Sequence, residues 1–337
     1  MNKDTMKDIV KFIKKTIVLT LLIEGIGALL LLYSTITYTN SFWKGLFAAV
    51  FMSISSFCGA GFDILGTEAK PFASLSAFAT DVTMLLPIMF LIILGGIGFV
   101  VLIDGFKNIR TKQHTKVVLL MTSILLLGGA AMFLICEWNN PNTIGNMSFG
   151  NKLLNALFQS ASARTAGLAT FNQSEMSPLG KLTTMILMFI GGSPNSMAGG
   201  IKTTTLFIIL MFIFKIPNSK GDIRIKDKRI NQRLIMRALR VFIYTLLITI
   251  TSIVLIRIFE PNTISTESII FETISAISTT GFSIGITPVL TNISKIIISA
   301  LMFIGRVGLT TIIVSISNRI LYSVTDEIEY PISDLII

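Results

Sequence analysis

Three short segments of the sequence end in small residues around a glycine, and their backbone carbonyls could bind a cation. Aligned on that glycine without gaps, they read SSFCGAGF (55–62), ASARTAGL (161–168) and SAISTTGF (275–282). Glycine adopts the left-handed and extended conformations that aim successive carbonyls to one side. Such carbonyls can replace the water around a monovalent cation, and the C-terminus of a preceding half-helix adds partial negative charge. We therefore predict a cation filter; re-entrant loops with only a packing role are the alternative.

A second segment with unusual chemistry interrupts an apolar stretch of the chain. Residues 191–205 read GGSPNSMAGGIKTTT, and apolar runs lie on both sides, at 182–190 and 206–214. Unwound backbone at membrane depth is tolerated where it is buried in protein or lines a water-filled path. We predict a movable gate that crosses the pore, in which the side chains of Ser193, Asn195, Ser196 and Thr203 satisfy freed backbone groups. The predicted gate residues are Gly191, Gly192, Ser193, Pro194, Asn195, Ser196, Gly199, Gly200, Lys202 and Arg306.

Four charged residues lie within or beside apolar stretches. An unpaired charge at the centre of a membrane helix costs about 2.5–3.5 kcal/mol. Arg306 should therefore face a cavity below the filter and slow cation flow, or else form a structural ion pair. Arg164 is expected behind the filter, paired with a carboxylate such as Glu272. Glu24 is expected to make a structural contact, and Lys202 either to contact the loop or to extend toward the cytoplasm.

The elements that position these residues are membrane helices. The chain has 337 residues, of which 52% are hydrophobic and 14% charged, whereas soluble domains carry about 25% charged residues. Spans need about 20 apolar residues, and six are predicted, at 16–33, 83–103, 117–136, 181–214 (broken), 238–258 and 295–316. Three further segments, 43–66, 152–172 and 266–287, are too short and polar to cross. The predicted fold is an all-α integral membrane protein.

Basic residues indicate the orientation of these spans. Segments 1–15, 104–116 and 215–240 hold 18 of the 28 Lys and Arg residues, which is the positive-inside pattern. We predict a plasma-membrane protein of bacterial type with both termini in the cytoplasm, and a basic amphipathic helix over 1–15 that lies along the membrane surface. The stacking aromatics of a nucleic-acid surface are not interleaved with these basic residues, so nucleic acid is not a predicted partner.

The chain repeats itself. The three filter glycines are 106 and 114 residues apart, and the motifs LIILGG (91–96), LMFIGG (187–192) and LMFIGR (301–306) follow them. Repeats of this length indicate tandem structural units. We predict three units of span, pore helix with filter loop, and span, at 16–110, 111–230 and 231–337. The gate and Arg306 then lie at similar depth, because both follow their filter glycine by about 24 residues.

Signals of an enzyme or of a resident metal are weak. The chain has two cysteines, Cys58 and Cys136, and one histidine, His114, which is too few for a disulfide framework or a zinc site. The sequence shows no paired acid–base carboxylates and no nucleophile triad. We predict that the protein is not an enzyme and binds no covalent cofactor.

These motifs resemble the ion-conducting subunit of the Ktr/Trk/HKT superfamily of potassium transporters, most nearly the Ktr type. The resemblance covers essentially the whole chain and rests most specifically on 191–205, 164–167, 271–276 and 305–308. It implies potassium uptake, with sodium as a second or coupled ion, through a filter of backbone carbonyls. It also implies a homodimer of membrane subunits and a cytosolic ring of nucleotide-binding regulatory subunits. The implied filter residues are Gly59, Ala60, Gly61, Phe62, Thr165, Ala166, Gly167, Leu168, Thr279, Thr280, Gly281 and Phe282.

The chain departs from this family in the number of units. The family has four around one pore, and this sequence contains three, so the first is expected to be missing and the chain alone not to conduct. A separate polypeptide that supplies the first unit, and a non-conducting remnant or membrane scaffold, are both left open. A secondary transporter of a small organic solute would require inverted repeats, whereas these units all begin and end on the basic side.

Overall fold

The computed structural model describes residues 3–66, 73–104, 112–164, 166–215, 222–225 and 228–308, and it is helical apart from one small hairpin. The helices are α1 (Lys3–Thr39), α2 (Phe42–Phe57), α3 (Val82–Ile97), α4 (Phe99–Asp104), α5 (Gln113–Glu137), α6 (Phe149–Ala163), α7 (Pro178–Phe189), α8 (Thr203–Phe214), α9 (Gln232–Phe259), α10 (Thr266–Ser278) and α11 (Asn292–Val307). Single 3₁₀ turns lie at Ser76–Phe78, Gln173–Glu175 and Thr287–Val289. Strands β1 (Ile223–Ile225) and β2 (Lys228–Ile230) pair antiparallel, with Arg224 opposite Arg229.

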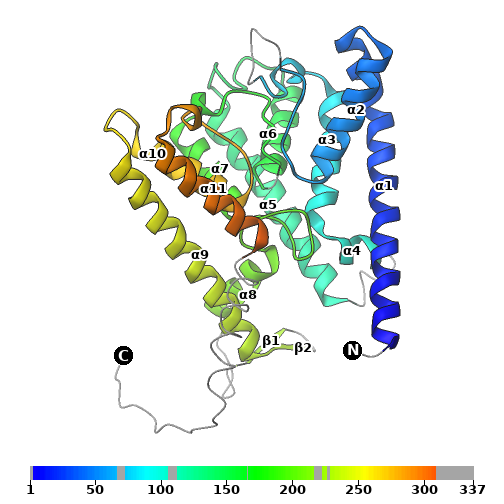
Figure 1. Cartoon of the computed structure of the whole chain (residues 1–337), viewed down its shortest axis with the longest axis vertical. Helices are drawn as coiled ribbons and strands as arrows, with labels where there is room; N and C mark the ends of the chain where they lie inside the picture. Colours follow the sequence, from blue (N-terminus) through cyan, green and yellow to red (C-terminus); the bar gives the residue numbers. More distant parts are fainter. Residues whose placement is uncertain are drawn as a thin grey trace.

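Helix order follows the predicted repeat. Each unit has a long first helix, a short pore helix and a second helix: α1, α2 and α3; then α5, α6 and α7; then α9, α10 and α11 (Figure 1). The three helices of each unit pack against one another, and the second helix of one unit packs against the pore helix of the next, as α3 does on α6 and α7 on α10. Within the described residues, Ile9–Thr39, Gln113–Glu137 and Gln232–Phe259 are long and apolar enough to cross a membrane.

The second helices differ from the predicted spans. A break at 181–214 was expected and is present between α7 and α8, but the span predicted at 83–103 is also broken, at Gly98, into α3 and α4. Gly98 has φ +97° and Gly308, at the end of α11, has φ +84°. Each lies three residues after the first glycine of its LGG or IGR motif, so a glycine with positive φ recurs at equivalent positions. The part of the predicted span 295–316 beyond Gly308 lies outside the described residues.

The N-terminal segment also differs from expectation. Residues 1–15 were predicted as a separate helix along the membrane surface, but α1 is one helix from Lys3 to Thr39. Its basic turns therefore continue the first long helix instead of forming an element of their own. No proline or glycine occurs between Lys3 and Glu24 to interrupt it.

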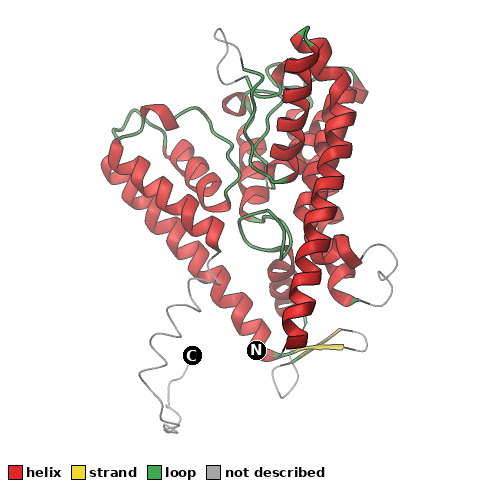
Figure 2. Ribbon diagram, turned by 45° about the vertical axis from the view of Figure 1, so that its right-hand side comes forward, coloured by secondary structure: helices red, strands yellow, loops and turns green. Residues whose placement is uncertain are grey.

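Each pore helix packs one side against the longer helices of its unit. Phe158 of α6 and Phe271 of α10 are fully buried, as are Met52 and Phe57 of α2. Burial of this kind stabilises a short helix that would be marginal alone. Figure 2 shows that irregular segments run through the interior of the protein with helices around them. These segments hold the predicted filter and gate.

Glutamates at the ends of two first helices hold the starts of the second helices. Glu137, 1% exposed, accepts hydrogen bonds from the Ser177 backbone N–H (2.9 Å) and hydroxyl (2.6 Å) and from the Thr143 hydroxyl (2.8 Å). Glu260 likewise accepts from the Thr291 backbone N–H (2.9 Å) and hydroxyl (2.8 Å). Ser177 and Thr291 are the N-caps of α7 and α11. Each of the two glutamates therefore connects the first and the second helix of its unit.

Glu260 shows how these bonds affect ionisation. Burial acts to raise the pKa of its carboxyl, but the hydrogen bonds from Ser294 and Thr291 outweigh it, so the pKa lies below the ordinary value. A depressed pKa means that the folded state favours the ionised carboxylate. The resulting stabilisation is present at neutral pH and is lost as the pH falls through the lowered pKa.

Replacing Glu137 with alanine should destabilise the fold. The change leaves the buried hydroxyl of Thr143 and the half-buried hydroxyl of Ser177 without their carboxylate acceptor, and hydrogen bonds to charged groups contribute about 1.5–3 kcal/mol each. We expect the free energy of unfolding to fall by about 3 kcal/mol or more. The measurement is the midpoint of thermal unfolding in detergent, which should be lower. Glu175→Ala is the control, because Glu175 makes its side-chain bond to Asn142 at an exposed site. An unchanged midpoint for Glu137→Ala would contradict this account.

Candidate ion-conduction site

The three filter glycines have the left-handed backbone that the sequence predicts. Gly61 has φ +73°, Gly167 +69° and Gly281 +93°. Each follows the C-terminus of its pore helix within a few residues, because α2 ends at Phe57, α6 at Ala163 and α10 at Ser278. The chain therefore leaves each pore helix and immediately turns through a conformation that favours glycine.

Neighbouring filter strands touch through these glycines. A Cβ atom added to Gly61 would lie 2.2 Å from the carbonyl oxygen of Ala166, and one added to Gly167 would lie 2.1 Å from that of Thr280. Among the described residues, no atom lies within 4 Å of a Cβ added to Gly281. The strands thus follow one another in chain order around a common centre, and the side next to Gly281 is open in the described residues. Of the predicted filter residues, Thr165 lies outside the described part.

Pore-helix serines, which the sequence analysis did not single out, support these strands. The Ser55 hydroxyl donates to the carbonyl of Phe62 (2.6 Å), and the Ser162 hydroxyl donates to that of Leu168 (2.7 Å). In the third strand the Ser275 hydroxyl accepts from the Gly281 N–H (3.2 Å). The carbonyls after the first two glycines are therefore held toward their own pore helices. Serines five or six residues before each glycine were a signal in the repeat alignment that could have identified them.

The gate segment is an ordered loop. Its two ends pair, with a parallel bridge between Ile190 and Ile201 and a bond from the Thr203 N–H to the Gly192 carbonyl (3.1 Å). The Ser193 and Thr203 hydroxyls are 3.0 Å apart, and the Ser196 hydroxyl donates to the Ser193 carbonyl (2.6 Å). Three of the four side chains expected to satisfy freed groups thus make hydrogen bonds inside the loop.

Helix α3 of the preceding unit holds one side of the loop. The Ser193 N–H donates to the Gly96 carbonyl (2.9 Å), and the Phe99 N–H donates to the Asn195 carbonyl (3.0 Å). A Cβ on Gly98 would lie 2.5 Å from the Pro194 carbonyl oxygen. Asn195, with φ +57°, therefore acts through its backbone, whereas its side chain was expected to act. The break between α3 and α4 supplies the free N–H that the loop uses.

The following unit holds the other side of the loop. Arg306 of α11 donates through Nη1 to the Met197 carbonyl (2.6 Å), and Lys202 donates to the Ala198 carbonyl within the loop. Gly199 packs on the end of α10, where an added Cβ would lie 2.4 Å from the Ser278 carbonyl oxygen. The loop therefore begins at the end of α7 and contacts elements of both other units. It lies next to the C-terminal ends of the pore helices. Arg306 was expected at a depth similar to that of the loop, and its bond to Met197 shows that the two are in contact.

Helix glycines bring the second helices against the pore helices. A Cβ on Gly95 would lie 2.0 Å from the Phe57 carbonyl oxygen, and one on Gly305 would lie 2.1 Å from that of Ile277. Gly191 holds the equivalent position in the middle unit. A Cβ added there would instead lie 1.9 Å from the carbonyl oxygen of Gly199 in the loop. The repeated glycine thus sets the depth at which filter, helix and gate meet.

One expected ion pair is wrong. Glu272 accepts hydrogen bonds from Ser283 and Thr287 (3.0 Å for Thr287), and within the described residues Arg164 forms no salt bridge. Arg164 is 4% exposed, and its Nε has no partner there. Glu24 makes the structural contact expected of it, because its Oε1 lies 3.6 Å from Cys58 Sγ, beside the first filter strand.

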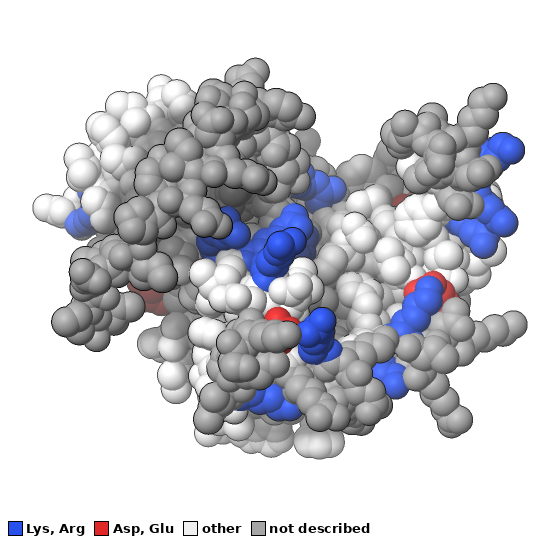
Figure 3. Space-filling view, turned by 90° about the horizontal axis from the view of Figure 1, so that it is seen from below, with Lys and Arg blue, Asp and Glu red and all other residues white. Residues whose placement is uncertain are grey.

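Seen from the end where α1 begins, the molecule is hollowed, and Lys and Arg side chains lie within and around the hollow with few acidic ones visible (Figure 3). The described residues contain no group of three or more His, Cys, Asp or Glu residues that could hold a metal ion. The arrangement that remains is three adjacent glycine-centred strands, with the carbonyls of Ala166 and Thr280 against the neighbouring glycines and a loop beyond them. It can coordinate a desolvated monovalent cation and obstruct its path.

Comparisons with known proteins agree with this geometry. Residues 2–320 match the model of the TrkH family, described as cation transport protein. The potassium/sodium uptake protein NtpJ of Enterococcus hirae is 38% identical over 322 residues, covering 94% of this chain and 69% of that protein. The Ktr system potassium uptake protein B of Bacillus subtilis is 36% identical, with 94% and 70% covered.

A solved structure shares the fold. The potassium transporter TrkH from Vibrio parahaemolyticus superposes with a TM-score of 0.63 at 16% sequence identity, over 85% of this chain and 62% of that one. The chain thus spans less than two thirds of that structure and about 70% of the two relatives. The repeated units, the filter glycines and the match over most of its length show that the chain belongs to the TrkH family of cation transport proteins.

Proposed function

We propose that the chain is the pore-forming part of a potassium uptake system of the plasma membrane, with sodium as a second or coupled ion. One observation carries the proposal: three glycine-centred strands meet through their carbonyls, and a loop held from both sides lies directly after them. Relatives named for potassium or potassium/sodium uptake support the choice of ion. The basic segments support an orientation with the N-terminus in the cytoplasm.

We propose that a fourth loop occupies the open side of the filter. The second helix of each unit packs on the next pore helix in the first two units, which leaves α11 without a following pore helix and α2 without a preceding second helix in the described residues. Both helices carry large exposed apolar side chains, such as Phe303 (69%) of α11 and Trp43 (76%) and Phe47 (64%) of α2. We propose that a further span–loop–span unit fills this gap, supplied by the same protein or by a separate polypeptide.

Growth of potassium-uptake-deficient cells at low potassium tests both parts of this proposal. The 337 residues expressed with a segment that encodes a fourth unit should restore growth, and the same residues alone should not. Gly281→Ala should then be as damaging as a substitution at Gly167, because the fourth strand would occupy the space beside Gly281. Rescue by the 337 residues alone would contradict the fourth-unit proposal, and failure of every combination despite membrane insertion would contradict potassium uptake.

Assembly is proposed from the resemblance to the Ktr type. The membrane subunit would form a homodimer and bind a cytosolic ring of nucleotide-binding subunits at its basic end, where the β1–β2 hairpin lies. The family is one of cation transport proteins. We therefore propose no enzymatic role.

Removing the Arg306 clamp should increase flux. Arg306→Gln shortens the side chain and removes its charge, so the bond to the Met197 carbonyl is lost and only the packing of Gly199 on α10 holds the loop on that side. A bond to a charged group contributes about 1.5–3 kcal/mol, and we expect cation uptake in the completed system to rise by about threefold to tenfold. Arg257→Gln is the control. Arg257 lies in the last turn of α9 and donates hydrogen bonds to Asn262 and to the Ile264 carbonyl. Lower uptake at normal membrane level would contradict the clamp.

A further inference from the structure

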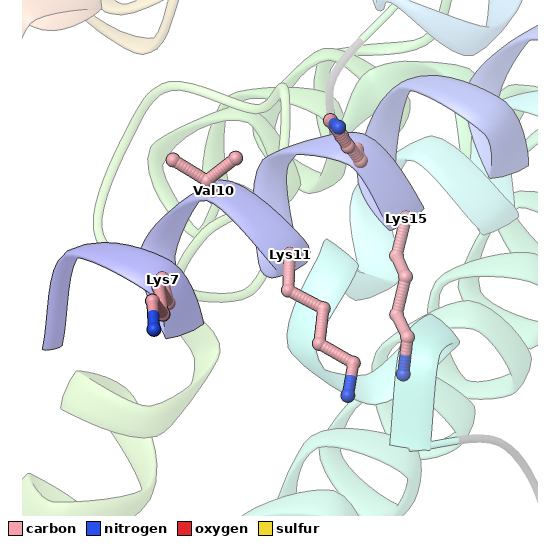
Figure 4. A pocket seen from close by; sticks show the side chains of 5 residues that line it. Lys7, Val10, Lys11 and Lys15 are labelled. Carbon is pink, nitrogen blue, oxygen red and sulfur yellow. The ribbon is translucent and has the colours of Figure 1, made fainter. Parts of the chain in front are cut away.

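The first turns of α1 carry a stripe of lysines that the conduction site does not use. Lys7, Lys11, Lys14 and Lys15 follow the i, i+4, i+7, i+8 spacing that places side chains on one face of a helix. Together with Val10 they line a shallow pocket of about 490 Å³, and the side chains of Lys11 and Lys15 extend to the same side in Figure 4. None of the four forms an ion pair in the described part of the chain. Asp4 and Asp8 leave residues 1–15 with a net charge of +3.

The other faces of the same turns are apolar and exposed. Ile9 is 41% exposed, Phe12 40%, Ile13 50% and Ile17 53%. On a helix of 100° per residue these side chains lie opposite the lysine stripe. A face that pairs exposed apolar side chains with lysines is typical of the boundary between hydrocarbon and headgroups. A water-soluble anion would not account for the apolar half.

The length of α1 places the lysines at that boundary. From Lys15 to Thr39 the helix rises about 36 Å, enough to cross the roughly 30 Å hydrocarbon core, and Lys11 and Lys7 lie about 6 and 12 Å beyond Lys15. Because α1 is one helix, these side chains extend through the headgroup layer. The lipid phosphates are therefore at the height of the lysine amines.

We propose that Lys7, Lys11, Lys14 and Lys15 bind the phosphate headgroups of anionic phospholipids in the cytoplasmic leaflet. Each lysine near an anionic membrane surface favours binding about fivefold. Loss of four should weaken retention of anionic lipid by tenfold or more. The site is independent of the filter, so it stands or fails separately from the proposed transport.

The test compares two quadruple variants of the detergent-purified protein. K7Q/K11Q/K14Q/K15Q removes the charges, and K7R/K11R/K14R/K15R keeps them with similar side-chain length. Binding is measured by titration with fluorescent phosphatidylglycerol and with the matching phosphatidylcholine. We expect the unmodified protein and the arginine variant to prefer phosphatidylglycerol, and the glutamine variant to lose at least tenfold in that preference. Monodisperse elution of each variant on size exclusion verifies folding.

Three results would overturn the proposal. Unchanged phosphatidylglycerol binding by the glutamine variant would place lipid binding elsewhere. Displacement of the lipid by inorganic phosphate at equal concentration would show a site for free anions. Unchanged lipid binding combined with loss of an acidic cytosolic subunit from the purified complex would assign the lysine face to a protein partner.

Discussion

Gly167→Ala should abolish cation uptake. Gly167 has φ +69°, a conformation that costs a residue with a side chain about 1–2 kcal/mol. The added methyl carbon would also lie 2.1 Å from the carbonyl oxygen of Thr280 and 3.0 Å from its carbonyl carbon. Both are backbone atoms of the next filter strand, so a flexible side chain cannot move aside to relieve the contact. The two strands must separate, and carbonyls that should surround a cation then lose their positions.

The expected loss is at least about a hundredfold, which corresponds to about 2.7 kcal/mol of barrier. Rubidium or potassium uptake is measured in the completed system, in cells without their own potassium uptake, and is normalised to the amount of protein in the membrane. Gly128→Ala is the matched control, because Gly128 lies in helix α5 with no atom within 4 Å of an added Cβ. Alanine is favoured over glycine in a helix by about 1 kcal/mol, so this variant should insert and transport normally.

Retention of near-normal uptake by Gly167→Ala, with normal selectivity for potassium over sodium, would show that this strand does not line the ion path. Retained uptake with lost selectivity would instead support the filter, because separated strands fit a dehydrated ion less closely. Gly61→Ala provides a second case, since its Cβ would lie 2.2 Å from the Ala166 carbonyl oxygen.

The features predicted best are those that repeat. Gly61, Gly167 and Gly281 recur with the same small neighbours, and repetition distinguishes a backbone requirement from an incidental glycine. The loop after Gly191 was predicted because polar residues in an apolar stretch must have a partner at membrane depth. Arg306 was predicted to lie at the depth of this loop because of its place in the repeat, and its bond to Met197 shows that the two are in contact.

Features that depend on tertiary contacts were not predictable in this way. The break at Gly98 lies in an uninterrupted apolar run, and it is explained by the carbonyls of Pro194 and Asn195 that approach from the loop. The hydrogen bonds between Glu137 and Ser177 join residues that are 40 positions apart in the sequence. The partner expected for Arg164 was wrong because sequence shows that a buried charge needs a partner but does not show which carboxylate is already bonded elsewhere.

Deleting residues 193–198 should raise cation flux in the completed system. The segment contains the Met197 carbonyl that binds Arg306, the Asn195 carbonyl that binds the Phe99 N–H and the Ser193 N–H that binds the Gly96 carbonyl. The Met197 N–H also donates to the Gly95 carbonyl (3.3 Å), so the deletion removes all four of these hydrogen bonds together and leaves the packing of Gly199 on the end of α10. What remains of residues 190–203 is a short connection at one wall of the path.

The ends of this deletion are close enough to join. A Cβ on Gly192 would lie 2.5 Å from Cβ of Ala198, and one on Gly191 would lie 1.9 Å from the Gly199 carbonyl oxygen. Joining Gly192 to Gly199 therefore needs little movement of α7 or α8, and both joined residues are glycines that tolerate a new turn. The deletion should leave membrane insertion and thermal stability within the range of the parent protein.

We expect a rise in flux of about tenfold, since a barrier lowered by about 1.4 kcal/mol gives this change. The parent, the deletion and Arg306→Gln are compared by initial rates of rubidium uptake at equal membrane levels. A gate held by several contacts predicts a larger increase for the deletion than for Arg306→Gln, because that substitution leaves the contacts with α3 in place. Equal or lower flux from a well-assembled deletion would show that the loop supports the filter from below and does not obstruct the ion.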